Sequence, residues 1–281
     1  MRCLRCVGLF ALAVLIVGVM SAGASPVGKT IHFSSLDKSQ TYDLSGTLYL
    51  PENAPTPCPA VVVVHGTTGI DMRDAFYRGP ILDVGIATFE VDFKTGVFTT
   101  AFDRPKPDAF APMAFAALKE LRKLPAIDPN RIAIMGFSLG GAITLRTAME
   151  TNRKMWMGDD QGFAAYAAFY PVSKPFMTEL QVSGSKLTGA PIIIFYGTED
   201  SYGEGTAVPA LKSFLAQKYH FDVTTVEYPG ATHGFNRNAP SVTYPDPAAI
   251  GGKGYMQWDA DAANDSVTRV VAFLRANLAA K

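Results

Sequence analysis

The sequence predicts an α/β fold, built on a mostly parallel sheet of about eight strands with helices on both faces. Short, continuous apolar runs such as residues 60–64 recur along the chain, and such runs are typical of strands buried on both faces of a parallel sheet. Segments with apolar residues at helical spacing, such as residues 110–124, separate some of these runs. Strands that alternate with helices indicate a sheet that is covered on both sides.

Length and composition are consistent with one folded unit. The chain has 281 residues, of which 48% are hydrophobic and 18% are charged, so it is long enough to bury one sizeable core. Basic and acidic residues number 25 each, and neither sign forms long runs. This balance argues against nucleic acid as a partner.

The first 24 residues have the pattern of a secretory signal peptide. Arg2 and Arg5 precede an apolar stretch at 7–20, and residues 21–24 offer a cleavage site of small residues. The stretch is shorter than the roughly 20 residues needed to span a bilayer. We therefore expect cleavage, no stable membrane anchor afterwards, and a secreted or periplasmic protein. Cleavage would leave Cys58 as the only one of the three cysteines, so no internal disulfide is expected.

The expected elements follow one another in a simple order. We expect strands at residues 30–33, 44–50, 60–64, 86–91, 131–135, 164–169, 191–196 and 223–228. We expect helices at residues 110–124, 211–218 and 266–279. Residues 236–258 are expected to form a long irregular segment.

A nucleophile elbow is the most informative motif of the chain. Gly136-Phe137-Ser138-Leu139-Gly140 follows the apolar run at 131–135 and precedes residues that suit a helix. In a G-x-S-x-G turn, small residues let a strand turn sharply into a helix, so that the serine hydroxyl is lifted out and the free N–H groups of the helix point toward it. Ser138 is therefore the predicted nucleophile.

A serine hydroxyl needs a base, because it is a poor nucleophile at neutral pH. Of the four histidines, His32 and His65 precede the serine. His220 lies before the expected strand 223–228, at the end of the sheet opposite to the expected site. His233 follows the expected strand 223–228 at its C-terminal end, where the sites of parallel sheets form. We therefore predict that His233 is the base.

The acid that orients the histidine is expected between the serine and the histidine. Glu199 and Asp200 directly follow the expected strand 191–196; we choose Asp200, with Glu199 as the alternative. The order Ser138, Asp200, His233 is that of the α/β-hydrolase triad, in which the acid fixes the imidazole tautomer and stabilises the imidazolium.

Two N–H donors are expected to hold the oxyanion of a tetrahedral intermediate. One is that of Leu139, the residue after the nucleophile, and the other comes from the glycine-containing loop 65–69. We assign the second donor to Thr67, with Thr68 as the alternative, and expect His65 to brace the loop. No histidine pair has the spacing of metal ligands on a helix and cysteines are few, so no metal and no cofactor are expected.

Four short segments occur together in one order along the chain. They are Val62-Val63-Val64-His65-Gly66, Asp128-Pro129-Asn130-Arg131-Ile132 ahead of the elbow, Gly197-Thr198-Glu199-Asp200, and His233-Gly234-Phe235. This ordered set resembles the dienelactone hydrolase family of the α/β-hydrolases. The resemblance implies the α/β-hydrolase fold with a single catalytic domain over residues 25–281, a cofactor-free serine hydrolase mechanism, and small-molecule ester or lactone substrates.

The sequence departs from that family at the nucleophile. The founding dienelactone hydrolases use cysteine and are cytosolic, whereas this chain has Ser138 and a predicted export signal, so we expect a substrate other than dienelactone. Arg237, four residues after His233, resembles an arginine with which that group holds a substrate carboxylate, and a guanidinium suits such bidentate pairing. The alternative is a surface arginine that binds nothing.

Specificity is expected to come from loops above the triad. Residues 155–157 and 169–187 form one candidate apolar wall, and the segment 236–258 with its aromatic residues forms another; ordinary packing is the alternative. Asp71 and Arg73 are expected to be a solvated pair, with bracing of the oxyanion loop as the alternative. The predicted substrate-binding residues are Thr68, Arg237 and Trp258.

The leading interpretation is an exported serine hydrolase that cleaves carboxylic esters or lactones through an acyl-enzyme on Ser138. One alternative is a peptidase or acyl-peptide hydrolase, which shares the elbow and triad order but usually carries a large accessory domain. The other is a non-catalytic binding protein on a hydrolase fold. Because all triad candidates and the glycine loop are present, we favour the enzyme.

Overall fold

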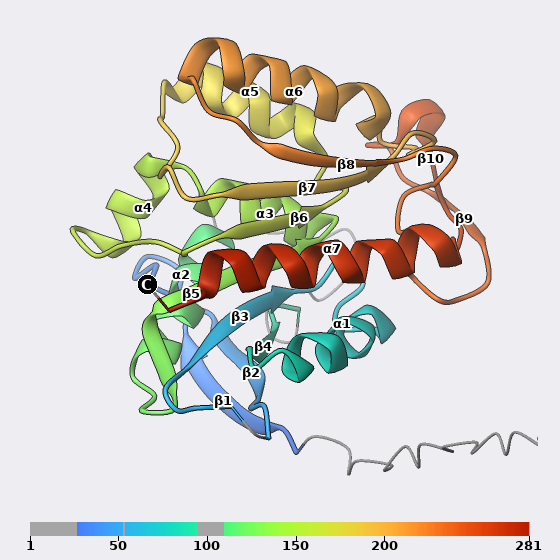
Figure 1. Ribbon diagram of the computed structural model, residues 1–281. Coiled ribbons are helices and arrows are strands. Elements are labelled where there is room, and N and C mark those ends of the chain that lie inside the picture. Colours follow the sequence, from blue (N-terminus) through green and yellow to red (C-terminus); the bar gives the residue numbers. More distant parts are fainter. Residues whose placement is uncertain (1–26, 53, 95–109, 281) are drawn as a thin grey trace, which may run out of the picture.

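An eight-stranded sheet forms the centre of the computed structural model, which describes residues 27–52, 54–94 and 110–280 (Figure 1). The strand order is β1-β2-β4-β3-β5-β6-β7-β8. Strands β3 to β8 run parallel, and β1 and β2 are antiparallel to their neighbours. The predicted, mostly parallel sheet is thus confirmed. The strands are β1 (Lys29–Ser34), β2 (Asp43–Tyr49), β3 (Cys58–Val64), β4 (Ala87–Asp92), β5 (Ile127–Phe137), β6 (Tyr166–Phe169), β7 (Ile192–Gly197) and β8 (Thr224–Tyr228).

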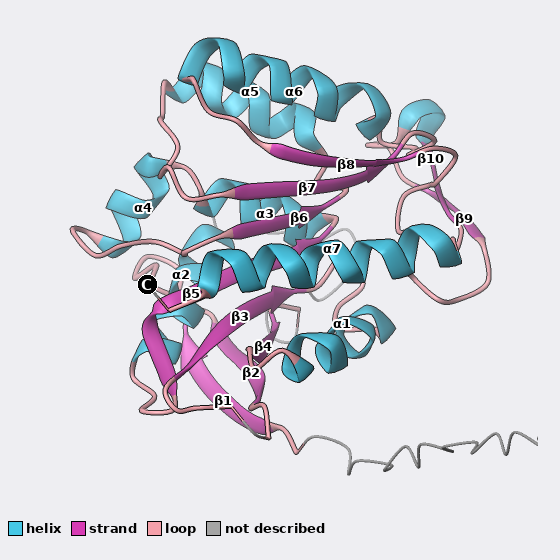
Figure 2. Ribbon diagram, viewed as in Figure 1, coloured by secondary structure: helices cyan, strands magenta, loops and turns pink. Residues whose placement is uncertain are grey.

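Helices cover both faces of this sheet (Figure 2). One face carries α1 (Met72–Asp83) and α7 (Ala260–Leu278). The other face carries α2 (Phe110–Arg122), α3 (Leu139–Thr147), α5 (Ser173–Ser183) and α6 (Glu204–Tyr219), and the short α4 (Glu150–Met157) lies beside α2 and α3. The predicted signal peptide, residues 1–24, lies outside the described residues. Within the described ranges, no helix combines the length and apolar character needed to cross a bilayer.

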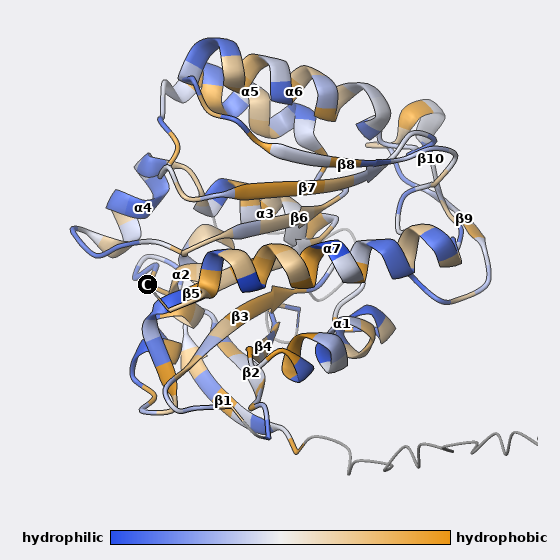
Figure 3. Ribbon diagram, in the orientation of Figure 1, coloured by the Kyte–Doolittle hydropathy of each residue, from blue (hydrophilic) through white to orange (hydrophobic). Residues whose placement is uncertain are grey.

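Strand β3 shows why its sequence is apolar without interruption. Val61 and Val63 point into the core beneath α1 and α7, whereas Val62 and Val64 point into the core on the opposite face. A strand that is buried on both faces has no position for a polar side chain. Figure 3 shows the same concentration of hydrophobic residues along β3 and β7.

Three helices of the structure, α1, α4 and α5, were not predicted. Helix α1 contains Gly79 and Pro80, which weaken a helical pattern. Its start has a sequence signal, because Asp71 and Asp74 form a capping box. Helix α6 begins seven residues before its predicted start at residue 211, and it contains Pro209, a residue that weakens a helical pattern.

The segment 236–258 is not irregular throughout, as predicted, but contains a small β-hairpin. Strands β9 (Val242–Pro245) and β10 (Lys253–Met256) pair antiparallel, and the short 3-10 helix η2 (Ile250–Gly252) lies between them. We call residues 242–256 the hairpin. It lies beyond the C-terminal ends of the parallel strands (Figure 1), on the side of the sheet where the predicted catalytic residues converge.

Candidate active site

Ser138 occupies a strained turn between β5 and α3. Its backbone has φ 53° and ψ −111°, in a region that residues other than glycine rarely adopt and that is often found at functional sites. The helix start is pressed against β3, since a Cβ added at Gly140 would lie 2.1 Å from the carbonyl oxygen of Val64. Val64 is also paired in register with Gly136. The nucleophile turn therefore lies directly beside the loop that follows β3.

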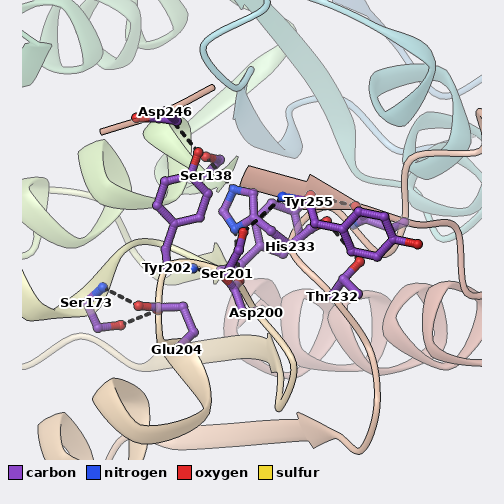
Figure 4. Close-up of polar contacts among 12 residues, drawn as sticks. Ser138, Ser173, Asp200, Ser201, Tyr202, Glu204, Thr232, His233, Asp246 and Tyr255 are labelled. Carbon is purple, nitrogen blue, oxygen red and sulfur yellow. Dashed lines mark hydrogen bonds and ion pairs between the residues drawn. The ribbon is translucent and has the colours of Figure 1, made fainter. Parts of the chain in front are cut away.

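A continuous chain of hydrogen bonds joins the three predicted triad residues. His233 Nε2 lies 2.8 Å from Ser138 Oγ, and His233 Nδ1 lies 2.8 Å from Asp200 Oδ2. His233 and Asp200 are both buried, whereas the side chain of Glu199 is exposed. A carboxylate only accepts hydrogen bonds, so Nδ1 carries the proton and the lone pair of Nε2 faces the serine hydroxyl. Figure 4 shows these side chains pointing toward one another.

His65 lies beside the site but makes a different set of contacts. Its Nδ1 donates to the carbonyl oxygen of Gly66 at 2.6 Å, and its Nε2 accepts from the backbone N–H of Phe93 at 3.0 Å. Burial lowers the pKa of His65, which keeps the ring neutral and fits this pattern of one donor and one acceptor. His65 therefore braces the loop after β3, as the sequence analysis expected.

The loop after β3 turns tightly at Gly66-Thr67-Thr68-Gly69. The N–H of Gly69 bonds to the carbonyl oxygen of Gly66 at 3.1 Å, which leaves the N–H groups of the two central threonines outside the turn's own hydrogen bond. Thr67 and Thr68 line the same cavity as Ser138. Leu139 begins α3, and its N–H belongs to the first turn, which has no partner within the helix. The structure thus places Thr67 and Leu139 close to Ser138, and their role as oxyanion donors stays a prediction.

Arg73 and Asp71 are not the solvated pair that we expected. The Arg73 side chain is only 3% exposed, and its Nε and NH2 groups donate to the Asp71 carboxylate at 2.8 and 2.6 Å. Its NH1 group donates to the Tyr170 hydroxyl at 3.1 Å, which in turn donates to Asn236 Oδ1. The guanidinium also lies against Gly66. The alternative is therefore correct: the pair braces the loop 65–69, which carries the predicted oxyanion donor.

A cavity of about 620 Å³ opens at Ser138 and defines the candidate substrate site. Predicted residues Thr68 and Arg237 line it, but Trp258 does not: the Trp258 ring packs edge-on against Phe76 at 5.7 Å. None of the residues at 155–157 or 169–187 contributes to the lining. Within the part of the chain that the structure describes, the wall comes mainly from the hairpin and the loop 65–69. The lining residues are Gly66, Thr67, Thr68, Arg73, Ser138, Tyr202, Arg237, Val242, Tyr244, Pro245, Asp246, Pro247, Ala248 and Met256.

A second cavity, of about 740 Å³, lies at the opposite end of the parallel strands. Residues between β2 and β3, the turn before β4 and the end of α7 surround it. None of the triad residues lines this second cavity. We therefore assign substrate binding to the cavity at Ser138.

Sequence analysis missed Glu204, a fully buried acidic residue at the start of α6. It follows the loop that carries Asp200, which we call the acid loop (residues 198–203). Both oxygens of the Glu204 carboxylate accept hydrogen bonds at 2.7 Å, one from the backbone N–H and one from the hydroxyl of Ser173. Burial raises the pKa of Glu204 to about 7. Glu204 fastens the start of α6 to the start of α5, and it lies in the part of α6 that the prediction omitted.

Replacing Glu204 by glutamine is expected to change how stability depends on pH. Because the pKa of Glu204 is about 7 in the folded protein and ordinarily 4.5, the folded state retains a proton that the unfolded state releases between these values. Wild-type stability therefore falls as pH rises through this window. Relative to wild type, Glu204→Gln should gain on the order of 3 kcal/mol between about pH 4.5 and about pH 8.

Urea unfolding at the two pH values measures this effect. Glu199→Gln is the matched control, because it removes an exposed carboxylate from the loop just before α6. Unfolding free energies of wild type and Glu204→Gln that change in parallel with pH would contradict the expectation.

Comparison with known families places the fold and the site in context. The profile of the dienelactone hydrolase family matches residues 90–278, which is well over half of the chain. The chain belongs to the dienelactone hydrolase family. The profile of FrsA-like esterases also matches, over residues 19–157. As a member of this hydrolase family with a serine at the elbow, the protein is a serine carboxylic-ester hydrolase.

Individual relatives of this family member are distant in sequence. A non-reducing polyketide synthase of Stachybotrys bisbyi is 27% identical over 153 residues, which cover 48% of this chain but only 7% of that protein. The dienelactone hydrolase-like promiscuous phosphotriesterase P91 from metagenomic libraries has a TM-score of 0.62 and 18% identity, over 89% of this chain and 98% of its own. Esterase Est2 of Thermogutta terrifontis with bound propionate has a TM-score of 0.59 and 18% identity, over 89% and 96%. These likenesses show the α/β-hydrolase fold.

Proposed function

We propose that this member of the family is an exported hydrolase that cleaves carboxylic esters or lactones through an acyl-enzyme on Ser138. The observation that carries the proposal is the hydrogen-bonded series from Asp200 through His233 to Ser138 at the mouth of a cavity. The structurally similar Est2 has been captured with bound propionate and, in a further structure, phosphorylated by paraoxon. Both observations on that protein support an esterase chemistry for this one.

The geometry supplies each step of acyl transfer. His233 Nε2 takes the Ser138 proton as Oγ attacks the carbonyl carbon, and the N–H groups of Leu139 and Thr67 hold the charge on the carbonyl oxygen. Collapse of the intermediate breaks the bond to the alcohol, which leaves with the proton from His233. Water then attacks the acyl-enzyme with His233 as the base, which releases the acid and restores Ser138. Asp200 stabilises the imidazolium during both acylation and deacylation.

Arg237 indicates the charge of the preferred substrate. Its guanidinium is half-buried in the cavity wall, and among the described residues it makes no side-chain hydrogen bond or ion pair. Asp71, the carboxylate nearby, is already held by two hydrogen bonds from Arg73. We propose that Arg237 receives a carboxylate of the substrate.

Replacing Arg237 by glutamine should therefore weaken the binding of acidic esters. We expect KM for an ester with a carboxylate on its acyl group to rise about tenfold or more, because a charge-assisted hydrogen bond is lost. Kinetics on the same ester with that carboxylate methylated provide the control, and there KM should stay nearly constant. Equal effects on both esters would contradict a role in carboxylate recognition.

The proposed activity is tested by hydrolysis of p-nitrophenyl esters, from acetate to decanoate, by residues 25–281. An equivalent series of peptide p-nitroanilides tests the peptidase alternative, and hydrolysis of these alone would replace the proposal. Export is supported by the pattern of residues 1–24. Expression of the full chain should place the esterase activity in the periplasm or medium, and activity confined to the cytosol would exclude export.

A further inference from the structure

Three consecutive residues of the loop after β7 connect the triad to the hairpin. Asp200 binds His233, as described above. Ser201 holds the hairpin backbone: its carbonyl oxygen accepts from the N–H of Ile250 at 2.8 Å, and its hydroxyl accepts from the N–H of Tyr255 at 3.1 Å. Tyr202, the third residue, reaches the hairpin through its side chain (Figure 4).

The hydroxyl of Tyr202 makes two hydrogen bonds to the hairpin. It donates to Asp246 Oδ2 at 2.7 Å and lies 3.1 Å from the hydroxyl of Tyr244. A phenol has a single proton, so Tyr244 donates to Tyr202 while Tyr202 donates to Asp246. Burial raises the pKa of Tyr202, which keeps this proton in place. The Tyr202 ring meanwhile packs on the His233 ring, with 4.4 Å between centroids.

The hairpin provides half of the described residues that line the cavity at Ser138. Its contributions are Val242, Tyr244, Pro245, Asp246, Pro247, Ala248 and Met256. A two-stranded hairpin is only marginally stable by itself in water, so its position depends on the groups that hold it to the rest of the protein. The Asp246 side chain is mostly buried, and loss of a donor to a buried carboxylate is costly. The other carboxylate oxygen, Oδ1, accepts the N–H of Ala248 within the hairpin, whereas the bond to Oδ2 joins the hairpin to the loop after β7. Loss of the Tyr202 hydroxyl therefore weakens the attachment of the hairpin to that loop.

We propose that Tyr202 is a specificity-determining residue whose hydroxyl, bound to Asp246 and Tyr244, fixes the hairpin as the wall of the ester site and limits the size of the acyl group. The proposal rests on the proposed esterase function and adds to it the feature that sets which acyl groups the site accepts. Its structural half, the fixing of the hairpin, does not require any particular substrate.

Tyr202→Phe tests the proposal, because it removes the hydroxyl and keeps the ring on His233. Tyr255→Phe is the matched control: the Tyr255 hydroxyl lies on the same hairpin, and its partner among the described residues is the exposed Gln257 side chain. In Tyr202→Phe, the ratio of kcat/KM for decanoate to that for acetate should rise about tenfold, as expected for loss of a hydrogen bond to a charged group. The ratio should be unchanged in Tyr255→Phe.

Two substitutions at Asp246 separate the hydrogen bond from the side-chain volume. In Asp246→Asn the amide oxygen stays on the N–H of Ala248 and the NH₂ group faces Tyr202. The Tyr202 hydroxyl can accept from that NH₂ group and donate to Tyr244, so the connection is kept and the chain-length profile should stay close to that of wild type. Asp246→Ala removes the acceptor and should reproduce the broadened profile of Tyr202→Phe. A broadened profile in Asp246→Asn equal to that in Asp246→Ala would overturn the assignment to the hydrogen bond.

Amide hydrogen exchange over residues 242–256 provides a readout that does not depend on ester hydrolysis. Exchange there should become about tenfold faster in Tyr202→Phe and not in Tyr255→Phe. Exchange and chain-length profile both equal to those of wild type would overturn the proposal, and so would faster exchange with an unchanged profile. If wild type cleaves no ester, the esterase function fails, and the exchange result alone decides whether the hydroxyl fixes the hairpin.

Discussion

Ser138→Ala is expected to abolish ester hydrolysis, with kcat lowered by a factor on the order of 10⁴ to 10⁶. The Ser138 hydroxyl is the atom that His233 Nε2 approaches at 2.8 Å, and no other hydroxyl takes its place at the end of the hydrogen-bonded series. The fold should be retained, because alanine and serine meet the same backbone strain at φ 53°. The rate of p-nitrophenyl acetate hydrolysis measures the first effect, and the thermal midpoint measures the second.

A second serine near the cavity provides the control for this substitution. Ser241 is exposed and directly precedes the hairpin, and Ser241→Ala should keep nearly all activity. Paraoxon should add a phosphoryl group to wild type and to Ser241→Ala, but not to Ser138→Ala, as intact mass would show. More than about a tenth of wild-type kcat in Ser138→Ala would exclude Ser138 as the nucleophile.

The parts of the site that sequence could predict are those with a local signal. Ser138 lies in a five-residue turn whose flanking strand and helix are themselves evident from hydrophobic pattern. His233 follows a strand at the end where parallel sheets place their sites. In both cases the residue and its structural context are neighbours in the chain, so no knowledge of distant contacts was needed.

Other parts depend on contacts between distant segments and therefore escaped prediction. Arg73 is buried because its guanidinium meets Tyr170, 97 residues further along, and nothing in its own segment signals that partner. The strands of the hairpin have four residues each, the shortest length at which an alternating pattern carries information. Glu204 was missed because it lies in the first turn of α6, before the predicted start of that helix at residue 211.

The choice between Glu199 and Asp200 shows where a local signal ends. Both are carboxylates after the same strand, and neighbouring residues in a turn point in different directions. The sequence alone therefore cannot decide which of the two carboxylates binds His233. The structure decides through the turn itself: Asp200 Oδ1 accepts the N–H of Tyr202 at 2.8 Å, which directs Oδ2 toward His233 Nδ1.

That pair of hydrogen bonds leads to the second large effect: Asp200→Asn should lower kcat by a factor on the order of 10³ to 10⁴. The N–H of Tyr202 requires an oxygen acceptor, so the asparagine amide would keep its oxygen there and turn its NH₂ group toward His233. Nδ1 would then have to accept a hydrogen bond, and the imidazole proton would move to Nε2. A protonated Nε2 cannot take the proton of Ser138.

Glu199→Gln is the matched control for this prediction, since it changes the neighbouring, exposed carboxylate in the same way. Its kcat for p-nitrophenyl acetate should stay within about threefold of wild type, as for other surface substitutions. The loss in Asp200→Asn should fall on kcat rather than KM, because the tautomer affects proton transfer and not ester binding. A larger loss in Glu199→Gln would mean that the acid loop rearranges when substrate binds, because the unbound geometry gives Glu199 no path to His233.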